Sequence, residues 1–471
     1  MEDAMSEGAG HGPVTVIGGG PCGALLSIYL ARAGHEVVLY ESRPDIRSAD
    51  VSAGRSINLA LATRGIVPLV EVGVIDRVDE ITIPMRGRMI HAEGSPEATL
   101  QPYGTRPHEV IHSVSRRDLN VILLDAAEAT GRVRLEFGHR LGAVDFAAST
   151  LTLTGPTGDV RDEQFGVVFG TDGANSAVRQ ALVEAGSRED VDELGHGYKE
   201  LTLPPGDDGR HRLDPNALHI WPRGEFMLIA LANPSGDFTV TLFAPNKGAG
   251  GFEGLVSGEG VRSFFTSEFP DVAASIPDLE EQFLTNPTGR LATLRTTGWS
   301  HGDRAVVLGD AAHAIVPFHG QGMNLAMESA RTLARLLSDV RDDRTAAFAA
   351  FERERKPNSD AIADMALDNY VEMRAGVVDP DYVIRRALAL ELERRHPDTW
   401  SPRYNMVMFS TMPYSQAQGR AAQQAEILEA LTRHATSLAA VDYDRAAAMV
   451  AELEPLPEVD PMALSDVLSL S

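Results

Sequence analysis

The sequence predicts a mixed α/β (α+β) fold, and three observations lead to that prediction. A strand–helix–strand pattern occupies residues 14–41, two further apolar runs end in turns near residues 172 and 310, and residues 346–440 have a mostly helical pattern. Short apolar runs followed by turn residues are typical of buried parallel strands. Because the three turns lie far apart in the chain, we expect one sheet to be assembled from discontinuous segments.

The composition argues against several classes of protein. The chain has 471 residues with a formal net charge of −25 and a pI near 4.9, whereas nucleic-acid binding needs a basic surface, so we expect no nucleic-acid partner. The only cysteine, Cys22, excludes an internal disulfide and a multi-cysteine metal site, and it fits a reducing compartment such as the cytoplasm. The acidic N-terminus lacks a signal-peptide pattern and no apolar run is long enough to span a bilayer, so we expect no membrane anchor.

A glycine-rich turn follows the first apolar strand and opens the first helix. Gly18 allows the tight turn, Gly20 lets the backbone approach a pyrophosphate, and Gly23 lets the helix pack closely on the strand. Glu41 ends the second strand, where an acid can bind ribose hydroxyls. The unit therefore predicts dinucleotide binding, with an ordinary turn between strand and helix as the alternative. We interpret Cys22 within the turn as a small filler and not as a reactive thiol.

Two aspartates follow the other apolar runs. Asp310 comes after residues 305–308, and an aspartate at a strand's carboxyl end can accept a hydrogen bond from a ribityl hydroxyl. Asp172 lies in a Gly-Thr-Asp-Gly turn, which is unremarkable by itself. A helix is expected over residues 324–340, and backbone N–H groups just before a helix stabilise negative charge. The loop that presents them contains Pro317, Phe318, His319, Gly320 and Gln321.

The segments between these motifs differ in pattern. Residues 80–104 look like polar strands and residues 119–129 like a helix, while residues 133–137 and 146–153 look like strands. Apolar and polar residues then alternate over residues 185–295 in the manner of strands. We expect this long segment to form a separate β-sheet that lies over the cofactor domain.

In this order and spacing, the three motifs resemble the flavoprotein aromatic hydroxylases of the p-hydroxybenzoate hydroxylase fold. The resemblance implies bound FAD, with the first motif at its ADP half, the Asp310 motif at its riboflavin half, and the Asp172 motif serving both cofactors. That family has no second Rossmann domain for NAD(P)H, and no second convincing G-x-G-x-x-G occurs here. The expected domains are a discontinuous FAD-binding domain (12–80, 105–184 and 296–345), a β-sheet substrate domain (81–104 and 185–295) and a helical C-terminal region (346–471).

Longer strings give a narrower resemblance, to the kynurenine 3-monooxygenase branch of that family. They cover nearly all of residues 13–410 and are not required by the fold alone. Phe318-His319 before Gly-Gln-Gly is similar to the bacterial members. Between Arg88 and Tyr103 this chain has one residue more than the usual pattern. The strings are residues 54–61, 85–91, 102–104, 198–202, 218–223 and 369–374.

The resemblance also implies the residues of the site. The substrate carboxylate is placed on Arg88 and Tyr103, with Asn369, Tyr404 and Glu372 nearby. The apolar wall for an aromatic ring is Leu218, Met227, Ile229, Leu231 and Phe243. FAD is placed against Gly18, Gly20, Cys22, Gly23, Glu41, Arg43, Ala60, Arg116, Leu141, Asp172, Asp310, Met323 and Asn324. No metal and no general base are implied, because the chemistry takes place on the flavin.

Physical chemistry agrees with these roles but leaves alternatives. An arginine binds a carboxylate through two N–H groups and a tyrosine hydroxyl adds a third donor. Arg88 could instead form a surface salt bridge, with Arg86 as the ligand, and Tyr103 could be a packed sheet aromatic. Glu372, Tyr404 and His319 could be structural. The five apolar wall residues could simply belong to the core.

The expected activity is hydroxylation of L-kynurenine to 3-hydroxy-L-kynurenine with NADPH and O2, by way of a flavin C4a-hydroperoxide. The reaction belongs to tryptophan degradation and to NAD biosynthesis via quinolinate. One alternative is a hydroxylase of a modified kynurenine or of anthranilate in a specialised pathway, and another is an FAD-binding protein that does not oxygenate. The sequence does not choose NADPH over NADH, and it leaves the oligomeric state open, a homodimer among the options.

Overall fold

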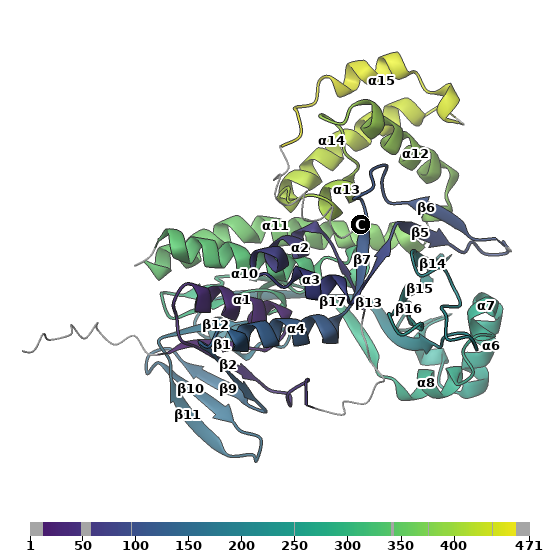
Figure 1. The fold of residues 1–471 in the computed structure, drawn as a ribbon. Helices are drawn as coiled ribbons and strands as arrows, with labels where there is room; N and C mark the ends of the chain where they lie inside the picture. The colour runs from purple at the N-terminus through teal and green to yellow at the C-terminus, as the bar shows by residue number, and fades with distance from the viewer. Residues whose placement is uncertain are drawn as a thin grey trace, which may run out of the picture.

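The computed structural model describes residues 13–48, 58–95, 97–248, 250–340, 343–374, 376–435 and 437–457 (Figure 1). The acidic N-terminus, and residues 54–57 of one resemblance string, lie outside the described residues. The fold is a mixed α/β one with four sheets and a helical C-terminal region, as the sequence predicts.

The central sheet has six strands in the order β18-β19-β12-β1-β2-β8, and all its neighbours are parallel except β18 and β19. Its strands come from three distant parts of the chain, so the expectation of a discontinuous sheet is confirmed. The bounds are β1 Val14–Ile17, β2 Val37–Glu41, β8 Val133–Phe137, β12 Val167–Gly170, β18 Ser300–His301 and β19 Ala305–Val307.

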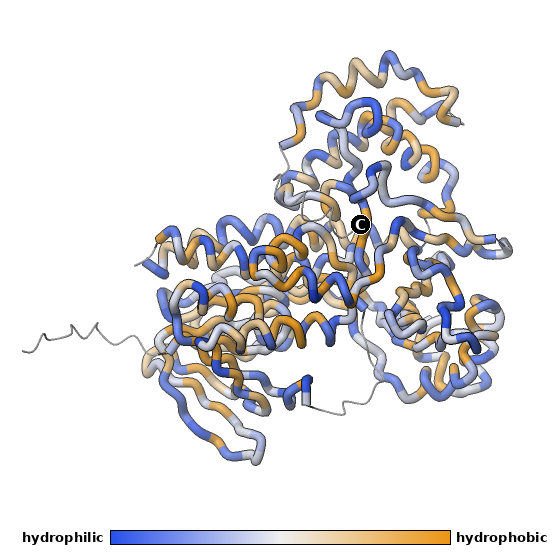
Figure 2. The backbone as a smooth tube through the Cα atoms, in the orientation of Figure 1, coloured by the Kyte–Doolittle hydropathy of each residue, from blue (hydrophilic) through white to orange (hydrophobic). Residues whose placement is uncertain are grey.

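Helices with apolar faces cover this sheet. Helix α1 (Pro21–Arg32) packs against α4 (Arg116–Ala129) and α10 (Gly322–Asp339), and all three contribute buried residues to one hydrophobic cluster with the strands. Figure 2 shows hydrophobic residues gathered along these elements. Gly34, just after α1, has φ +95° and its N–H donates to Ala31 O, so it ends the helix as a glycine cap should. The shorter helices nearby are α2 Thr63–Glu71, α3 Ile75–Asp79, α5 Ala177–Glu184, α9 Asp310–His313 and the 3-10 turn η2 Pro317–His319.

A small antiparallel sheet, β11-β10-β9, projects from this domain (Figure 1). The strands are β9 Arg140–Asp145, β10 Thr150–Thr154 and β11 Val160–Gln164. The expectation of one strand over 146–153 is wrong in its first half, because residues 146–149 form the turn between β9 and β10. Asp145 accepts the N–H groups of Ala147 and Ala148 there, a local bond that stabilises a turn.

The seven-stranded sheet β17-β13-β16-β15-β14-β5-β6 lies beside the central one (Figure 1). Neighbouring strands are antiparallel except β14 and β5, which are parallel. The bounds are β5 Gly87–Ile90, β6 Thr99–Pro102, β13 Arg188–Leu203, β14 Leu218–Arg223, β15 Phe226–Ala232, β16 Phe238–Pro245 and β17 Thr288–Thr297. The remaining strands of the described residues form a three-stranded sheet in the order β3-β7-β4 (Asn58–Leu61, Ile111–Ser115 and Thr82–Met85).

The expectation that residues 185–295 alternate throughout as strands is wrong over residues 252–285. This segment forms η1 Phe252–Gly254 and helices α6 Gly258–Glu268, α7 Pro270–Ala273 and α8 Leu279–Thr285. Val261, Phe265 and Phe269 recur every four residues and pack against the outer face of the sheet, which is the period of a helix and not of a strand. The domain boundaries given above stay a prediction.

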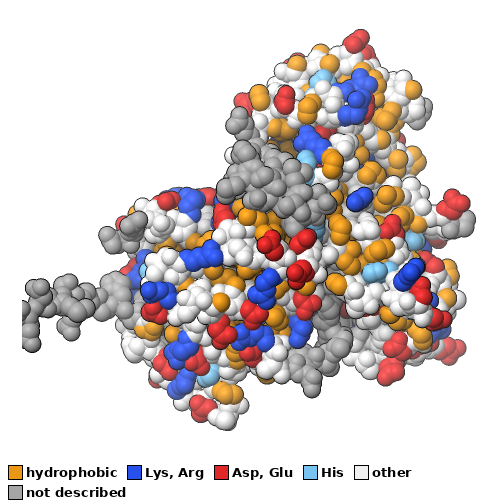
Figure 3. All heavy atoms as spheres, viewed as in Figure 1, with side chains coloured by type: hydrophobic (Ala, Val, Ile, Leu, Met, Phe, Trp, Pro, Cys, Tyr) orange, Lys and Arg blue, Asp and Glu red, His pale blue; other side chains and the backbone are white. Residues whose placement is uncertain are grey.

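The helical C-terminal region begins with the long helix α11 (Arg344–Arg374). It continues through η3 Gly376–Val378, α12 Pro380–Arg395, α13 Arg403–Met408, α14 Tyr414–Thr432, η4 Leu438–Ala440 and α15 Tyr443–Val450. Helix α14 packs on both α11 and α12. Among the described residues, no helix combines the length and the apolar character needed to cross a membrane. On the face shown in Figure 3, acidic and basic side chains are interspersed.

Replacing Gly23 with Ala should destabilise the protein, because an added Cβ would lie 2.0 Å from Gly18 O. Overpacking of this kind costs about 1–3 kcal/mol. In the matched control, Gly419 lies inside α14 with open space around it, and Gly419→Ala should raise stability by up to about 1 kcal/mol. Thermal unfolding of the two variants checks this pair; similar melting temperatures would contradict the packing role of Gly23.

Candidate functional site

The three sequence motifs meet at one edge of the central sheet. Strands β19, β12, β1 and β2 are successive parallel neighbours, so their carboxyl ends lie side by side. Asp310, Asp172 and the glycine turn follow the first three of these ends, and Glu41 is the last residue of β2. Ligands of open parallel sheets bind outside the carboxyl ends of the strands, so this edge is the candidate cofactor site.

The glycine turn has the geometry that its sequence predicts. Gly18 has φ +105°, and a Cβ there would lie 2.4 Å from Thr171 O, so β1 and the Asp172 turn approach closely only because Gly18 lacks a side chain. Gly20 has no atom within 4 Å of the position of a Cβ and borders a large cavity. The N-terminus of α1 begins at the next residue, where unpaired backbone N–H groups can bind an anion.

Glu41 lies beside the turn with its carboxylate fixed. It accepts a hydrogen bond from the Gly19 N–H at 2.9 Å and from Arg43 Nε at 2.9 Å. Burial alone would raise the pKa of Glu41, but the hydrogen bonds and charge of Arg43 lower it overall. The carboxylate therefore stays ionised, as an acceptor for ribose hydroxyls must.

Asp172 and Leu141 do not line the cavity. The Asp172 carboxylate accepts hydrogen bonds from Ser176 Oγ at 2.5 Å and from the Ala177 N–H at 2.7 Å, which fixes the start of α5. Leu141 is buried in the hydrophobic cluster of the cofactor domain. Asp172 therefore lies behind the wall of the site, between the lining residues Thr171 and Gly173, whereas neither Leu141 nor its chain neighbours line the cavity.

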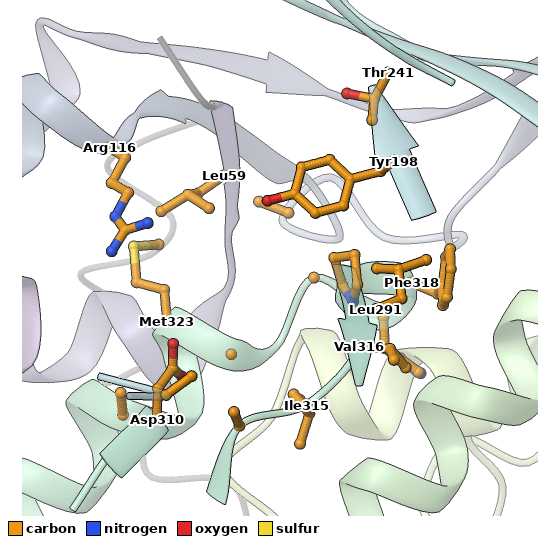
Figure 4. Close-up of a pocket in the computed structure, with 18 of the residues that line it drawn as sticks. Leu59, Arg116, Tyr198, Thr241, Leu291, Asp310, Ile315, Val316, Phe318 and Met323 are labelled. Carbon is orange, nitrogen blue, oxygen red and sulfur yellow. The ribbon is translucent and has the colours of Figure 1, made fainter. Parts of the chain in front are cut away.

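Asp310 and Arg116 face each other across the cofactor end of the cavity, with Met323 between them (Figure 4). The Asp310 side chain is open to the cavity, whose volume is about 920 Å³. Burial raises the pKa of Asp310, and the positive charge of Arg116 partly offsets this rise. An aspartate held in this way can accept a hydrogen bond from a ligand hydroxyl.

The loop from Pro317 to Gln321 crosses the middle of the cavity. Asn324 fixes it, because its Nδ2 donates to Gly320 O and to Ala60 O, both at 2.8 Å. Gln321 is fully buried and accepts a hydrogen bond from Tyr414 Oη at 2.7 Å. Pro317, Phe318, His319 and Gly320 line the cavity, whereas Gln321 and Asn324 hold the loop from behind.

Two observations indicate that this end of the cavity fits FAD. Gly20 leaves open the space that a side chain would fill, and Asp310 points a carboxylate into it. The residues that would hold the cofactor are the glycine turn and Glu41 at the pyrophosphate and ribose, and Arg116, Asp310 and Met323 further along. When bound, FAD supplies the activation of O2, and the protein supplies binding and orientation.

Arg88 lies at the other end of the cavity and is buried with 1% of its surface exposed. Its Nη1 donates to Glu372 Oε1 at 2.9 Å and its Nη2 to Asn369 Oδ1 at 3.3 Å. Its Nε has no hydrogen-bond partner among the described residues. The alternative of a surface salt bridge for Arg88 is therefore wrong, since the ion pair is buried and leaves one N–H unused.

Glu372 is shared between two arginines. Arg403 Nη2 donates to Glu372 Oε2 at 3.2 Å, and Tyr382 Oη donates to Oε1 at 2.7 Å. Burial alone would raise the pKa of Glu372, but the charges of Arg88 and Arg403 hold it at about 2. Arg403 also pairs with Asp368 at 3.4 Å, whereas Glu372 is the carboxylate that pairs with Arg88 among the described residues.

Two stacked tyrosines complete this end of the cavity. The rings of Tyr103 and Tyr404 lie with centroids 5.2 Å apart and an angle of 13° between planes, and Arg88 lies over the Tyr404 ring at 4.6 Å. The Tyr103 hydroxyl is buried and makes no well-formed hydrogen bond within the described residues. The β5–β6 hairpin fixes Tyr103 near Arg88 through the bond from Tyr103 N to Arg86 O at 3.0 Å.

His319 lies between the two ends of the cavity. It is buried, stacks on the Tyr404 ring with centroids 5.1 Å apart, and has no hydrogen-bond partner for either ring nitrogen among the described residues. Burial, helped by the charge of Arg403, lowers the pKa of His319 to about 3, so its imidazole is neutral at physiological pH.

Burial also raises the pKa of the Cys22 thiol in the glycine turn, which is consistent with a small filler and not with a reactive thiolate.

The apolar wall lies between the β-sheet and the loop. Leu218, Met227, Ile229, Leu231 and Phe243 all line the cavity, and they also belong to, or pack against, the hydrophobic clusters around it. Sequence reasoning did not name several other lining residues. Of these, Leu59 and Tyr198 belonged to strings used for the resemblance, whereas no sequence signal marked Thr241, Leu291, Ile315 and Val316 (Figure 4).

Known proteins resemble this chain over most of its length. The FAD-binding domain family matches residues 11–195 and 272–366. The kynurenine 3-monooxygenase of Myxococcus xanthus is 47% identical over 448 residues, covering 95% of this chain and 96% of the relative. That of Stenotrophomonas maltophilia is 47% identical over 433 residues, covering 91% and 94%. This chain belongs to the kynurenine 3-monooxygenase family.

Solved structures agree with membership of this family at the level of the fold. The tetrameric form of 2-methyl-3-hydroxypyridine-5-carboxylic acid oxygenase has a TM-score of 0.64 at 20% identity, covering 82% of this chain and 98% of that chain. PqsL of Pseudomonas aeruginosa, in complex with 2-aminobenzoylacetate, has a TM-score of 0.62 at 22% identity, covering 78% and 97%. The predicted fold class and the predicted FAD cofactor are both confirmed.

Replacing Asp310 with Ala should weaken FAD binding by about tenfold or more, because a hydrogen bond to a charged group contributes about 1.5–3 kcal/mol. Asp339→Ala is the matched control, since that aspartate lies exposed at the far end of α10. The flavin-to-protein ratio after dialysis measures the effect. Equal flavin retention in both variants would remove Asp310 from the cofactor site.

Proposed function

We propose that this protein is an FAD-dependent monooxygenase that hydroxylates L-kynurenine to 3-hydroxy-L-kynurenine with NADPH and O2. The observation that carries the proposal is that one cavity joins the FAD-side residues to a buried arginine, one N–H of which has no partner among the described residues. Membership of the kynurenine 3-monooxygenase family supports the choice of substrate. The protein's own part in the reaction is to bind, orient and exclude water.

Arg88 and Tyr103 are proposed to bind the amino-acid end of kynurenine. The Nε–H of Arg88 and the hydroxyl of Tyr103 are donors at the same end of the cavity, and neither has a hydrogen-bond partner among the described residues. A buried guanidinium favours a carboxylate there, since hydrogen bonds between an arginine and a carboxylate are strong. In this proposal Glu372 and Asn369 orient Arg88 by accepting hydrogen bonds from its guanidinium, and the Tyr404 ring packs against that guanidinium.

The apolar wall is proposed to hold the aromatic ring toward the flavin-side loop. Met227, Ile229 and Phe243 line the cavity between Arg88 and Phe318, so a ligand anchored by its carboxylate would extend along them. Correct positioning alone can contribute about 7–11 kcal/mol to a rate enhancement. The amino group makes the kynurenine ring electron-rich, and His319 with a pKa of about 3 is a weak base. No protein base is therefore assigned.

This reaction belongs to tryptophan degradation and leads toward NAD through quinolinate. The relatives do not favour the alternative of a modified kynurenine or anthranilate as substrate. The cytoplasmic location and a homodimeric state stay predictions. Fractionation of the host cell and analytical ultracentrifugation of the pure protein test them separately.

Purified protein incubated with L-kynurenine, NADPH and O2 should give a product heavier than kynurenine by one oxygen atom. The ratio of NADPH oxidised to product formed should be near one, because a closed apolar site protects oxygen transfer from water. Product mass and NADPH absorbance provide the measurement. NADPH oxidation that yields only hydrogen peroxide would contradict the proposal.

Replacing Arg88 with Ala should raise the KM for kynurenine by about tenfold or more, since a charged, paired hydrogen bond contributes a few kcal/mol. Arg88→Lys keeps the positive charge but lacks the planar guanidinium that can donate two N–H groups to one carboxylate, so it should give an intermediate KM. Arg86→Ala is the matched control, because Arg86 is exposed and does not line the cavity. Steady-state kinetics separate these cases, and a KM that rises for Arg86→Ala but not for Arg88→Ala would move the carboxylate site.

A further inference from the structure

Two buried glutamates meet outside the wall of the cavity, next to its carboxylate-binding end. Glu109 is 4% exposed and Glu393, on α12, is 1% exposed. Nδ2 of Asn405, on α13, donates to Glu109 Oε1 at 3.1 Å and to Glu393 Oε2 at 3.2 Å. One side-chain amide therefore bridges two carboxyl groups from segments almost 300 residues apart in the chain.

This cluster is joined to both tyrosines of the site. Glu109 Oε2 accepts the N–H groups of Thr105 and Arg106 at 2.7 and 2.8 Å, so it holds the loop that follows Tyr103. A Cβ at Gly104 would lie 2.0 Å from Glu109 Oε2, so the carboxylate packs directly on the backbone next to Tyr103. On the other side, Asn405 is the chain neighbour of Tyr404, whose ring stacks on Tyr103.

The cluster has more acceptors than donors. Its two carboxyl groups and Asn405 Oδ1 offer five oxygen atoms, and Asn405 Oδ1 has no hydrogen-bond partner among the described residues. A buried group of this composition is stabilised by an added proton, since a neutral carboxyl is a donor as well as an acceptor. The proton also removes the repulsion between two carboxylates that share one amide.

Glu393 is the carboxyl that takes this proton. Burial, and then the negative charge of Glu109, raise the pKa of Glu393 to about 7. The positive charge of Arg106 opposes this rise, as do the hydrogen bonds from Ser401 and Asn405. The neighbours of Glu393 are thus Glu109 and Arg106 on the Tyr103 loop, Ser401 before α13 and Asn405 on α13.

We propose that Glu393 is a positioning residue for substrate binding, and that its protonated form holds the Tyr103 loop and the Tyr404 helix together around the carboxylate of kynurenine. Loss of the proton leaves two carboxylates on one amide, which pushes the loop away from α13 and separates Tyr103 from Tyr404. The inference rests on the proposed function, because it assigns the tyrosines to the substrate.

The direction of the pH effect follows from the raised pKa. The closed, binding-competent form holds the Glu393 proton more tightly than the open form does, so kynurenine affinity is full only below the lower pKa of the open form and is lost as pH rises through about 7. Isothermal titration of L-kynurenine into the FAD-loaded protein should show a dissociation constant that rises about tenfold between about pH 6 and about pH 8.5. Near pH 7.5, titration in buffers of different ionisation heat should show proton uptake on binding.

Glu393→Gln cannot lose a proton and should keep the low-pH affinity across the whole range, without proton uptake. Glu393→Ala removes the contact and should bind weakly at every pH, so rescue by glutamine separates a proton-dependent role from a merely structural one. In kinetics the KM should follow the dissociation constant, while kcat at saturating kynurenine changes little. Glu391→Gln is the matched control on the same helix, because that partly exposed glutamate pairs only with Arg394 and Arg395 among the described residues.

A wild-type affinity that is independent of pH, or a Glu393→Gln variant that keeps the wild-type profile, would overturn the proposal. Should Glu393→Gln fail to fold, Glu109→Gln is the deciding variant. Because it removes the charge of Glu109, the midpoint of its pH-dependent kynurenine affinity should lie at lower pH than that of the wild type. An unchanged midpoint would refute the coupling between the two glutamates. Failure of the wild type to bind kynurenine at any pH would instead refute the proposed function itself.

Discussion

A buried positive charge is the constraint on which much of this structure depends. Arg88 lies on a short strand at the end of the cavity and is almost fully removed from water. A guanidinium in such a place needs a counter-charge and hydrogen-bond acceptors. Glu372 and Asn369 provide them from α11, and the Tyr404 ring lies against it from α13. The C-terminal helices therefore lie over the cavity because they complete the surroundings of one side chain.

The cofactor end depends on a different constraint, the alignment of parallel strands. Four strand ends from distant parts of the chain lie side by side, so each motif can be short and still contribute to one surface. The glycine at position 18 keeps two of these ends close together, since any side chain there would meet Thr171. The loop from Pro317 to Gln321 then joins this end to the substrate end, held by Asn324 on one side and by Tyr414 on the other.

Sequence reasoning succeeded where local pattern and chemistry coincide. The strand–turn–helix unit at Gly18 and the turns at Asp172 and Asp310 each carry their structure in a few adjacent residues. The resemblance named Arg88, Tyr103 and Tyr404, which the structure brings together at one cavity, and their roles stay predictions. It failed over residues 252–285, where the four-residue recurrence of Val261, Phe265 and Phe269 is a helical signal that the surrounding strands obscured. The sequence also could not predict which residues contact each site residue, because a contact such as Glu109 with Asn405 depends on how distant segments pack.

The ion pair between Arg88 and Glu372 joins residues 284 positions apart in the chain. At synthesis rates of about 5–20 residues per second, the ribosome needs on the order of tens of seconds to add that much chain. Within this interval β12 and then β19 complete the strands of the cofactor edge, while Arg88 still lacks its counter-charge. The cofactor half can therefore assemble first, and the substrate half becomes complete only when the last helices close over it.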